Sequence, residues 1–265
     1  MSCSLRQCSG MSPDACRRLS VVRVGVLSDV HGNLPALESV LADVEREAPD
    51  VVVVCGDVAS GPLPAETIDL LMSRTATLFV EGNADRGLVA AFDGLPLSAW
   101  AGPYAEWCAS RISRAQRDFI ATFEKTIRLD VAGLGRVLFC HGSPRSDEEI
   151  MSARTSLRRL RILLADVDAE AVVCGHTHMQ FDRSVDGLRV MNPGSVGMPY
   201  GAPGAYWALL GPDVELRCTD YDREAAAARI RSAAGEEIDD FVRENLLAVP
   251  RVDEALRFFA AHGGP

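Results

Sequence analysis

Two side chains that bind divalent metals stand two positions apart near the start of the chain. Asp29 and His31 belong to the segment SDVHGN (28–33), which follows an apolar run and precedes a helical pattern. In an extended or tightly turned backbone these two side chains can reach the same point. A carboxylate oxygen and an imidazole nitrogen there make half of a metal site. Taken alone, the pair is explained equally well as a helix cap and a polar loop residue.

Similar polar motifs follow other apolar, strand-like runs along the chain. They are Gly56-Asp57, Gly82-Asn83-Ala84-Asp85, His141-Gly142-Ser143-Pro144, Gly175-His176-Thr177-His178 and Asn192-Pro193-Gly194-Ser195. Three of the five histidines of the sequence lie in these motifs and His31 lies in the first segment, whereas His262 lies in a Gly-rich tail. A single histidine at a strand end is commonly an incidental polar residue, but four of five predict a shared metal site. We expect His262 to have no such role.

The elements that must position these motifs follow from the apolar pattern. Continuous apolar runs that alternate with helical patterns predict an α/β fold, in which polar groups gather beyond the strand ends. Apolar residues at helical spacing from Trp107 to Ile127 predict two helices, with a capping box at Ser113 and Gln116 starting the second. Other expected elements are a hairpin over 129–139, a helix after Ser156, a turn at Asp186-Gly187, strands at 205–210 and 214–218, and helices over 222–261.

Composition limits the classes of function. The chain has 265 residues, 48% of them apolar and 24% charged, with a formal net charge of -10. An acidic surface repels long polyanions, so we expect no long nucleic acid as partner, whereas a small phosphate compound remains possible. No apolar run approaches the roughly 20 residues of a membrane helix. We therefore expect a cytoplasmic protein without membrane association, and residues 1–20 lack the apolar stretch of a secretory signal.

The eight cysteines show no CxxC spacing, which favours a reduced compartment. Cys55, Cys140 and Cys174 stand directly before the polar motifs. Soft thiolate ligands are one interpretation of this position, and small buried strand residues are the simpler one.

In this order, the motifs resemble those of the calcineurin-like metallophosphoesterases over residues 21 to 219. Details of the Asn83, His141 and Asn192 motifs look like the small bacterial and archaeal phosphodiesterase branch typified by the YfcE proteins, whose longer members are often labelled diadenosine-tetraphosphatase-like. The resemblance implies a four-layer α-β-β-α sandwich of two mixed sheets, followed by C-terminal helices. We expect a disordered extension over 1–20, the phosphoesterase domain over 21–219 and a helical extension over 220–265 packed on the same domain.

The resemblance also implies a dinuclear metal centre. One metal would be held by Asp29, His31, Asp57 and His178, and the other by Asp57, Asn83, His141 and His176. Asp57 would bridge the two ions, and Asp57, Asn83 and His141 would take part in catalysis. Two carboxylates with neutral imidazoles and an amide leave the centre net positive, which favours phosphate binding and a bridging hydroxide. Such ligands suit Mn, Fe, Zn, Ni or Co, with Mn favoured for activity.

One departure from the wider superfamily concerns the leaving group. Protein phosphatases and repair nucleases of the superfamily have Gly-Asn-His, whose histidine assists the leaving group, and here Ala84 replaces it. Without that acid, phosphodiesters or phosphoanhydrides with good leaving groups are favoured. Tyr200 follows at a point where relatives often have a basic residue, and it could stack on a base.

Three residues near the expected ligands each allow two interpretations. Asp85 either orients a metal ligand or caps the following helix. Asn192 and Ser195 either orient ligands or form a tight turn, in which Gly194 and Gly197 let the backbone approach closely.

The favoured function is therefore a metal-dependent phosphodiesterase acting on small nucleotide-like substrates, with a homo-oligomer as one candidate assembly. The alternatives are a protein or small-molecule phosphomonoesterase, a nuclease on long DNA, and a non-catalytic metal-binding scaffold like the retromer subunit that resembles this fold. Because every expected ligand is present, the scaffold is disfavoured.

Overall fold

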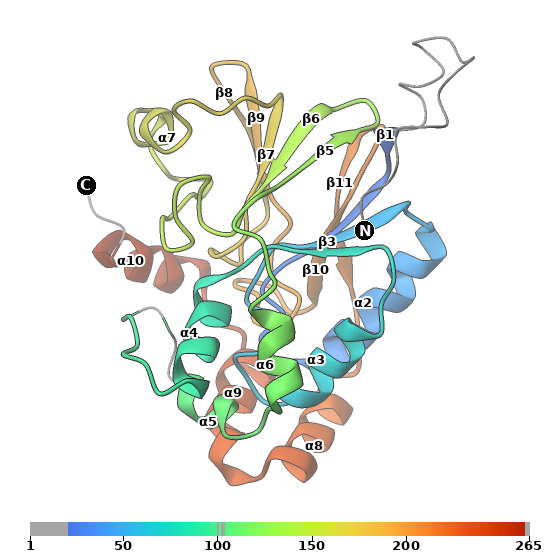
Figure 1. Cartoon of the computed structure of the whole chain (residues 1–265), viewed down its shortest axis with the longest axis vertical. Coiled ribbons are helices and arrows are strands. Elements are labelled where there is room, and N and C mark those ends of the chain that lie inside the picture. Colours follow the sequence, from blue (N-terminus) through green and yellow to red (C-terminus); the bar gives the residue numbers. More distant parts are fainter. Residues whose placement is uncertain (1–20, 100, 102–103, 263–265) are drawn as a thin grey trace.

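The structure is a computed structural model that describes residues 21–99, 101 and 104–262, with side chains described through Phe259. Its strands form two mixed sheets (Figure 1). One sheet has six strands in the order β1-β5-β6-β7-β9-β8, and the other has five in the order β11-β10-β2-β3-β4. The extension expected over 1–20 lies outside the described residues.

The strand bounds follow the apolar runs closely. They are β1 Val21–Val22, β2 Val24–Leu27, β3 Val51–Val54, β4 Thr77–Phe79, β5 Ile127–Val131, β6 Gly135–Phe139, β7 Ala171–Val173, β8 Phe181–Val185, β9 Leu188–Asn192, β10 Ala205–Leu210 and β11 Val214–Thr219. β2, β3 and β4 are parallel, as are β6, β7 and β9. Their carboxyl ends therefore carry the polar motifs to one side of each sheet.

The helices occupy the intervening and C-terminal segments. They are α2 Leu34–Glu47, α3 Pro64–Met72, α4 Asn83–Phe92, α5 Ala105–Ala109, α6 Arg114–Ile120, α7 Leu157–Leu163, α8 Arg223–Ala234, α9 Asp239–Phe241 and α10 Val252–His262, with a 3-10 turn at Glu236–Ile238 and a π-helix at Val242–Leu247. Among the described residues, no helix combines the length and apolarity needed to cross a membrane.

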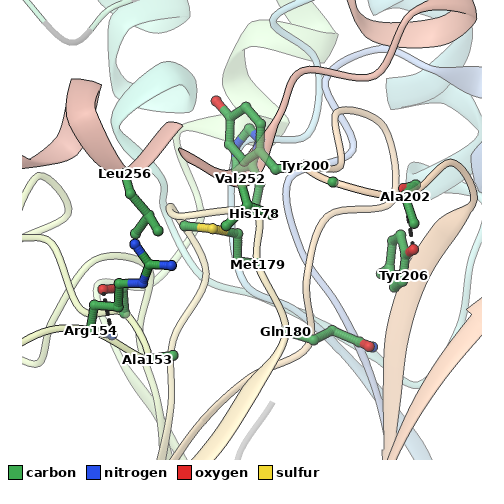
Figure 2. A pocket seen from close by; sticks show the side chains of 12 residues that line it. Ala153, Arg154, His178, Met179, Gln180, Tyr200, Ala202, Tyr206, Val252 and Leu256 are labelled. Atoms are coloured by element: carbon green, nitrogen blue, oxygen red, sulfur yellow. Dashed lines mark hydrogen bonds between the residues drawn. The ribbon is translucent and has the colours of Figure 1, made fainter. Parts of the chain in front are cut away.

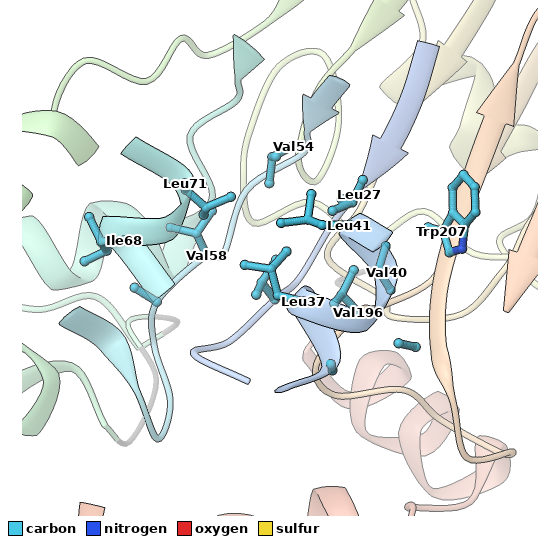
Figure 3. Close-up of a cluster of buried hydrophobic side chains, with 14 of the residues drawn as sticks. Leu27, Leu37, Val40, Leu41, Val54, Val58, Ile68, Leu71, Val196 and Trp207 are labelled. Atoms are coloured by element: carbon cyan, nitrogen blue, oxygen red, sulfur yellow. The ribbon is translucent and has the colours of Figure 1, made fainter. Parts of the chain in front are cut away.

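Three buried layers of side chains hold the sheets and helices together. Because successive strand residues point to opposite faces, Val137 and Phe139 pack between the two sheets, whereas Leu138 faces α7. The outer face of the five-stranded sheet packs on α2 and α3, where Leu37 and Trp207 belong to the largest cluster (Figure 3). Figure 1 shows α7 on one side of the sheets and α2 and α3 on the other. The expected helix–sheet–sheet–helix architecture is confirmed.

Local signals in the sequence are largely confirmed. The capping box at Ser113 and Gln116 begins α6, Ser156 caps α7, and Asp186-Gly187 connects β8 to its antiparallel partner β9. The prediction that the helical pattern extends to Ile127 is wrong at its end. α6 stops at Ile120, and Ile127 is the first residue of β5, because it pairs with Phe139 in the hairpin of β5 and β6.

Candidate metal centre

The seven expected metal ligands all come together in the structure. Each follows the carboxyl end of a strand: Asp29 and His31 after β2, Asp57 after β3, Asn83 after β4, His141 after β6, and His176 and His178 after β7. The first four belong to the five-stranded sheet and the last three to the six-stranded sheet. All seven residues are at most 8% exposed. The centre therefore lies where the two sheets meet.

The loops that carry the ligands adopt an unusual backbone. Asp29, His31, Asp57, His176 and His178 have φ angles of 56°, 49°, 56°, 65° and 57°, in the left-handed region that non-glycine residues disfavour. Hydrogen bonds between loops hold this conformation. The Asp29 amide donates to the Gly56 carbonyl and the His31 amide to the Asp57 carbonyl, both at 2.9 Å. Such strain collects at functional sites, where the surrounding structure enforces it.

Asp29, His31 and His178 form the first group of ligand atoms. The Nδ1 atoms of His31 and His178 lie 3.1 and 2.7 Å from the carbonyl oxygens of Ser60 and Met198. Because a carbonyl only accepts, each Nδ1 donates, and in a neutral ring the Nε2 atom then carries a lone pair. The two Nε2 atoms lie 3.2 Å apart, and Asp29 Oδ1 lies 3.2 Å from His178 Nε2. This donor set fits a divalent cation.

Asp57, His141 and His176 form the second group, whose ligand atoms lie within 4.8 Å of one another. His141 Nδ1 donates to the Cys55 carbonyl at 2.6 Å, so its Nε2 atom faces the centre. That Nε2 lies 3.0 Å from Asn83 Oδ1 and 3.4 Å from Asp57 Oδ2. Asp57 Oδ2 also lies 3.8 Å from His31 Nε2, so this one oxygen stands between the two groups.

The charges of the metal-free centre are strongly coupled. Burial alone would raise the pKa of Asp57, but the facing His141 holds that pKa well below its usual range. Burial would lower the pKa of His141, but the Asp57 carboxylate raises it to about 10. Burial lowers the pKa of His176 to about 3. His141 therefore carries a proton at a position where a cation would replace it.

Asp85 supports the centre through the backbone. Its carboxylate accepts from the amides of Asp57, Val58 and Gly82 at 2.7, 2.9 and 3.0 Å. The Gly82 bond caps α4, and the other two fix the turn that presents Asp57. Burial and the Asp57 charge raise the pKa of Asp85 to about 7. Both interpretations of Asp85 thus describe real contacts, although it makes no bond to His141.

Asn192 and Ser195 also act on the ligand loops. Ser195 Oγ donates to the Asp29 carbonyl at 2.7 Å, and Asn192 Nδ2 donates to the Gly175 carbonyl at 2.6 Å. A Cβ atom on Gly197 would lie 1.9 Å from the Val30 carbonyl oxygen, so only glycine permits this approach. The turn after β9 therefore braces the Asp29 loop.

The C-terminal helix reaches the centre, a role that the helical pattern over 222–261 left undecided. The ring of Tyr200 stacks on His178 with centroids 5.4 Å apart and planes at 21°. Phe259 of α10 packs edge-on against Tyr200 at 6.2 Å and lies 6.3 Å from the His176 ring. The signal available in the sequence was the helical spacing of Val252, Leu256 and Phe259, which marks one apolar face.

The cysteines before the motifs contribute their backbone rather than their sulfur. Cys55, Cys140 and Cys174 are buried, and neither metal group among the described residues contains a cysteine. Burial raises the pKa of the Cys174 thiol to about 12, which keeps it protonated. The side chain of His262 lies outside the described residues.

Comparison with known proteins identifies a family and several relatives. The family model described as calcineurin-like phosphoesterase superfamily domain matches residues 22–213. An uncharacterized protein of Methanocaldococcus jannaschii is 25% identical over 233 residues, which cover 78% of this chain and 91% of the relative.

Two solved structures share the fold over most of their length. A metallophosphoesterase from Sphaerobacter thermophilus is 26% identical with a TM-score of 0.67, over 86% of this chain and 99% of that one. A hypothetical protein from Pyrococcus horikoshii OT3 is 20% identical with a TM-score of 0.69, over 83% and 97%.

Proposed function

Because this chain belongs to the calcineurin-like phosphoesterase superfamily, we propose that it is a metal-dependent phosphodiesterase that hydrolyses small nucleotide-like phosphodiesters or phosphoanhydrides. The family is one of hydrolases, and the two groups of ligand atoms suit a dinuclear centre of divalent ions. The finer assignment to diesters and to particular ligands rests on the arguments below.

The observation that carries the proposal is the position of the Asp57 carboxylate. Its Oδ2 atom lies 3.4 Å from His141 Nε2 in one group and 3.8 Å from His31 Nε2 in the other. A carboxylate placed between two sets of imidazoles suits a bridging ligand. We propose that Asp29, His31, Asp57 and His178 hold one ion, and that Asp57, Asn83, His141 and His176 hold the other.

Two bound dications would supply a net positive centre that attracts phosphate and activates water near neutral pH. The chain fixes the geometry for that chemistry. Backbone carbonyls of Ser60, Met198 and Cys55 turn three imidazoles so that Nε2 faces inward. The Ala84 amide donates to Asp57 Oδ1 at 2.8 Å, which leaves Oδ2 directed to both groups. Preorganised ligands of this kind bind metal more tightly than mobile ones.

The substrate class follows from Ala84 and from charge. At the start of α4, a methyl group stands where a histidine would donate a proton, so a leaving group that departs as a stable anion is favoured. The formal net charge of -10 favours a small phosphate compound over long nucleic acid. Imidazole and oxygen ligands suit manganese, which we propose as an activating metal.

The test compares the protein loaded with Mn²⁺ on bis(p-nitrophenyl) phosphate and on p-nitrophenyl phosphate. We expect faster turnover of the diester. Asp57→Asn removes the charge that joins the two groups, so we expect the loss of at least one ion per chain and a drop in kcat/KM on the order of 1000-fold. Metal content is measured by mass spectrometry on the same samples.

The control is Asp168→Asn, which changes an exposed carboxylate paired with Arg136 far from the ligands. It should keep both the metal content and the rate. A faster monoester reaction would overturn the diester assignment, and an unimpaired Asp57→Asn enzyme would overturn the whole proposal.

A further inference from the structure

A cavity adjoins the candidate metal centre on the side of α10. It has a volume of about 310 Å³ and lies between the His178 loop, the segment 200–206 and the α10 helix (Figure 2). We call it the α10 pocket and define it by His178, Met179, Tyr200, Tyr206, Val252 and Leu256. Nothing in the chemistry described so far uses this space.

We propose that the α10 pocket receives the planar aromatic ring, a nucleobase or an aryl group, of a phosphodiester whose phosphate lies at the metal centre. The inference rests on the proposed function and assigns the group beside the phosphate. It makes α10 part of the substrate site.

The pocket begins at a candidate metal ligand. The Nε2 atom of His178 faces Asp29 in the centre at 3.2 Å, while the same residue lines the α10 pocket. Tyr200, which stacks on the His178 ring, continues the wall away from the centre. A group joined to the phosphate by one ester linkage can therefore reach this space. A volume near the lower end for ligand pockets suits one ring system.

The walls of the α10 pocket favour an apolar, aromatic occupant. Its aliphatic and sulfur-bearing sides come from Val252, Leu256 and Met179, and thioether sulfur packs well on aromatic rings. The polar hydrogens of two other lining residues are already used: the Gln180 amide donates to three backbone carbonyls, and Tyr206 donates its hydroxyl hydrogen to the Ala202 carbonyl at 3.2 Å.

The charge at the rim suits a group attached to an anion. Arg154 lines the pocket and directs its guanidinium towards Leu256 in Figure 2. Its ion pair with Asp253 is 3.6 Å long and largely exposed, and so holds the guanidinium weakly. None of the described lining residues is a carboxylate. A guanidinium in this position can lie over an aromatic ring or approach a phosphate oxygen.

The experiment varies only the group beside a constant leaving group. The three substrates are methyl, phenyl and thymidine 5′ esters of p-nitrophenyl phosphate, each hydrolysed by the Mn²⁺-loaded protein. Burying one ring face should raise kcat/KM on the order of 10-fold to 100-fold over the methyl ester. The phenyl and thymidine arms distinguish an aryl site from a nucleoside site.

Leu256→Trp fills the α10 pocket, and we expect it to bring the ratio of ring ester to methyl ester close to one. The matched control is Arg257→Trp, which adds the same bulk at the next, exposed position of α10 and should keep the wild-type ratio. Val252→Trp is a second filling variant in case Leu256→Trp fails to fold. Equal rates on the methyl and ring esters in the wild type, or an unchanged ratio in a folded filling variant, would overturn the proposal.

A binding measurement separates this proposal from the proposed function. Calorimetry compares phenyl phosphate with methyl phosphate on the wild type and on the filling variants. Tighter binding of phenyl phosphate that the filling variants abolish, together with no hydrolysis of any ester, would support the pocket and refute the phosphodiesterase. Hydrolysis without any preference for ring-bearing esters in rate or binding would support the phosphodiesterase and refute the pocket.

Discussion

At the scale of residues, backbone carbonyls orient the imidazole rings of the candidate centre through hydrogen bonds. Cys55 donates no thiol to the site, but its carbonyl fixes the ring of His141. The carbonyls of Ser60 and Met198 do the same for His31 and His178. Each contact selects the tautomer with a free Nε2 in the neutral ring. Ligand identity is thus set by side chains, and ligand orientation by the main chain.

The pair formed by Asp57 and His141 predicts a proton count for metal binding. In the metal-free protein the Asp57 carboxylate raises the pKa of His141 from 6.5 to about 10, so the ring is charged at pH 7.5. A metal ligand must be neutral, so binding should release at least about one proton per chain. Affinity should accordingly fall as pH falls below 10.

Calorimetric titration of Mn²⁺ at pH 7.5 in two buffers of different ionisation enthalpy measures this number. The heat should differ between the buffers in proportion to the protons released. Equal heats would mean that the ring is already neutral, and the charge pairing inferred for Asp57 and His141 would be wrong.

At the scale of elements, the strands end in loops that brace one another. The Gly197 amide donates to the Asp29 carbonyl at 3.0 Å, and its α-carbon has no room for a side chain. The turn after β9 in one sheet therefore presses on the loop after β2 in the other. The α10 helix adds a further layer, because its Phe259 packs on Tyr200 and His176.

Gly197→Ala tests this bracing. The new methyl group would lie 1.9 Å from the Val30 carbonyl oxygen, so the two loops must separate. We expect a loss of about 2 to 4 kcal/mol in the free energy of unfolding and at least a roughly 10-fold weaker metal affinity. Denaturant unfolding and metal titration measure the two effects.

Gly94→Ala is the comparison for this substitution. Gly94 has a φ of 67° but nothing within 4 Å of a new Cβ. Its cost should be limited to about 1 to 2 kcal/mol of backbone strain, with metal affinity retained. Equal metal affinity in the two variants would show that the approach of the loops is not needed for the site.

At the scale of the whole molecule, the candidate centre joins the two sheets. The five-stranded sheet supplies Asp29, His31, Asp57 and Asn83, and the six-stranded sheet supplies His141, His176 and His178. Side chains from both sheets are buried together at the end of their shared apolar layer. A cation bound there would contact both halves of the fold and would have no equivalent site in the unfolded chain.

Metal binding should therefore raise the thermal stability of the whole protein. At an ion concentration 100-fold above Kd, linkage gives about 2.7 kcal/mol per site, which for a chain of this size raises Tm by about 5 to 10 °C. Thermal unfolding with Mn²⁺ and after chelation measures the shift. The shift should shrink in Asp57→Asn, and an equal shift in that variant would place the stabilising ion elsewhere.

The sequence by itself determined a great deal of this protein. The apolar runs and the polar motifs after them predicted the strands, the α/β fold and the convergence of His31, His141, His176 and His178. These signals are local, because a buried strand and the loop after it are encoded by adjacent residues. The domain boundaries at 20 and 219 and the individual ligand roles stay predictions.

Only the tertiary structure decided how distant segments meet. His31 and His178 were expected at the same metal, but no local pattern encodes that their Nε2 atoms lie 3.2 Å apart across 147 positions of the sequence. The stacking of Tyr200 on His178 and the packing of α10 against Tyr200 and His176 were likewise not predictable from sequence, since an apolar helix face shows that it will be buried but not against what. Those partners are set only when the loops and α10 pack closely together in the folded chain.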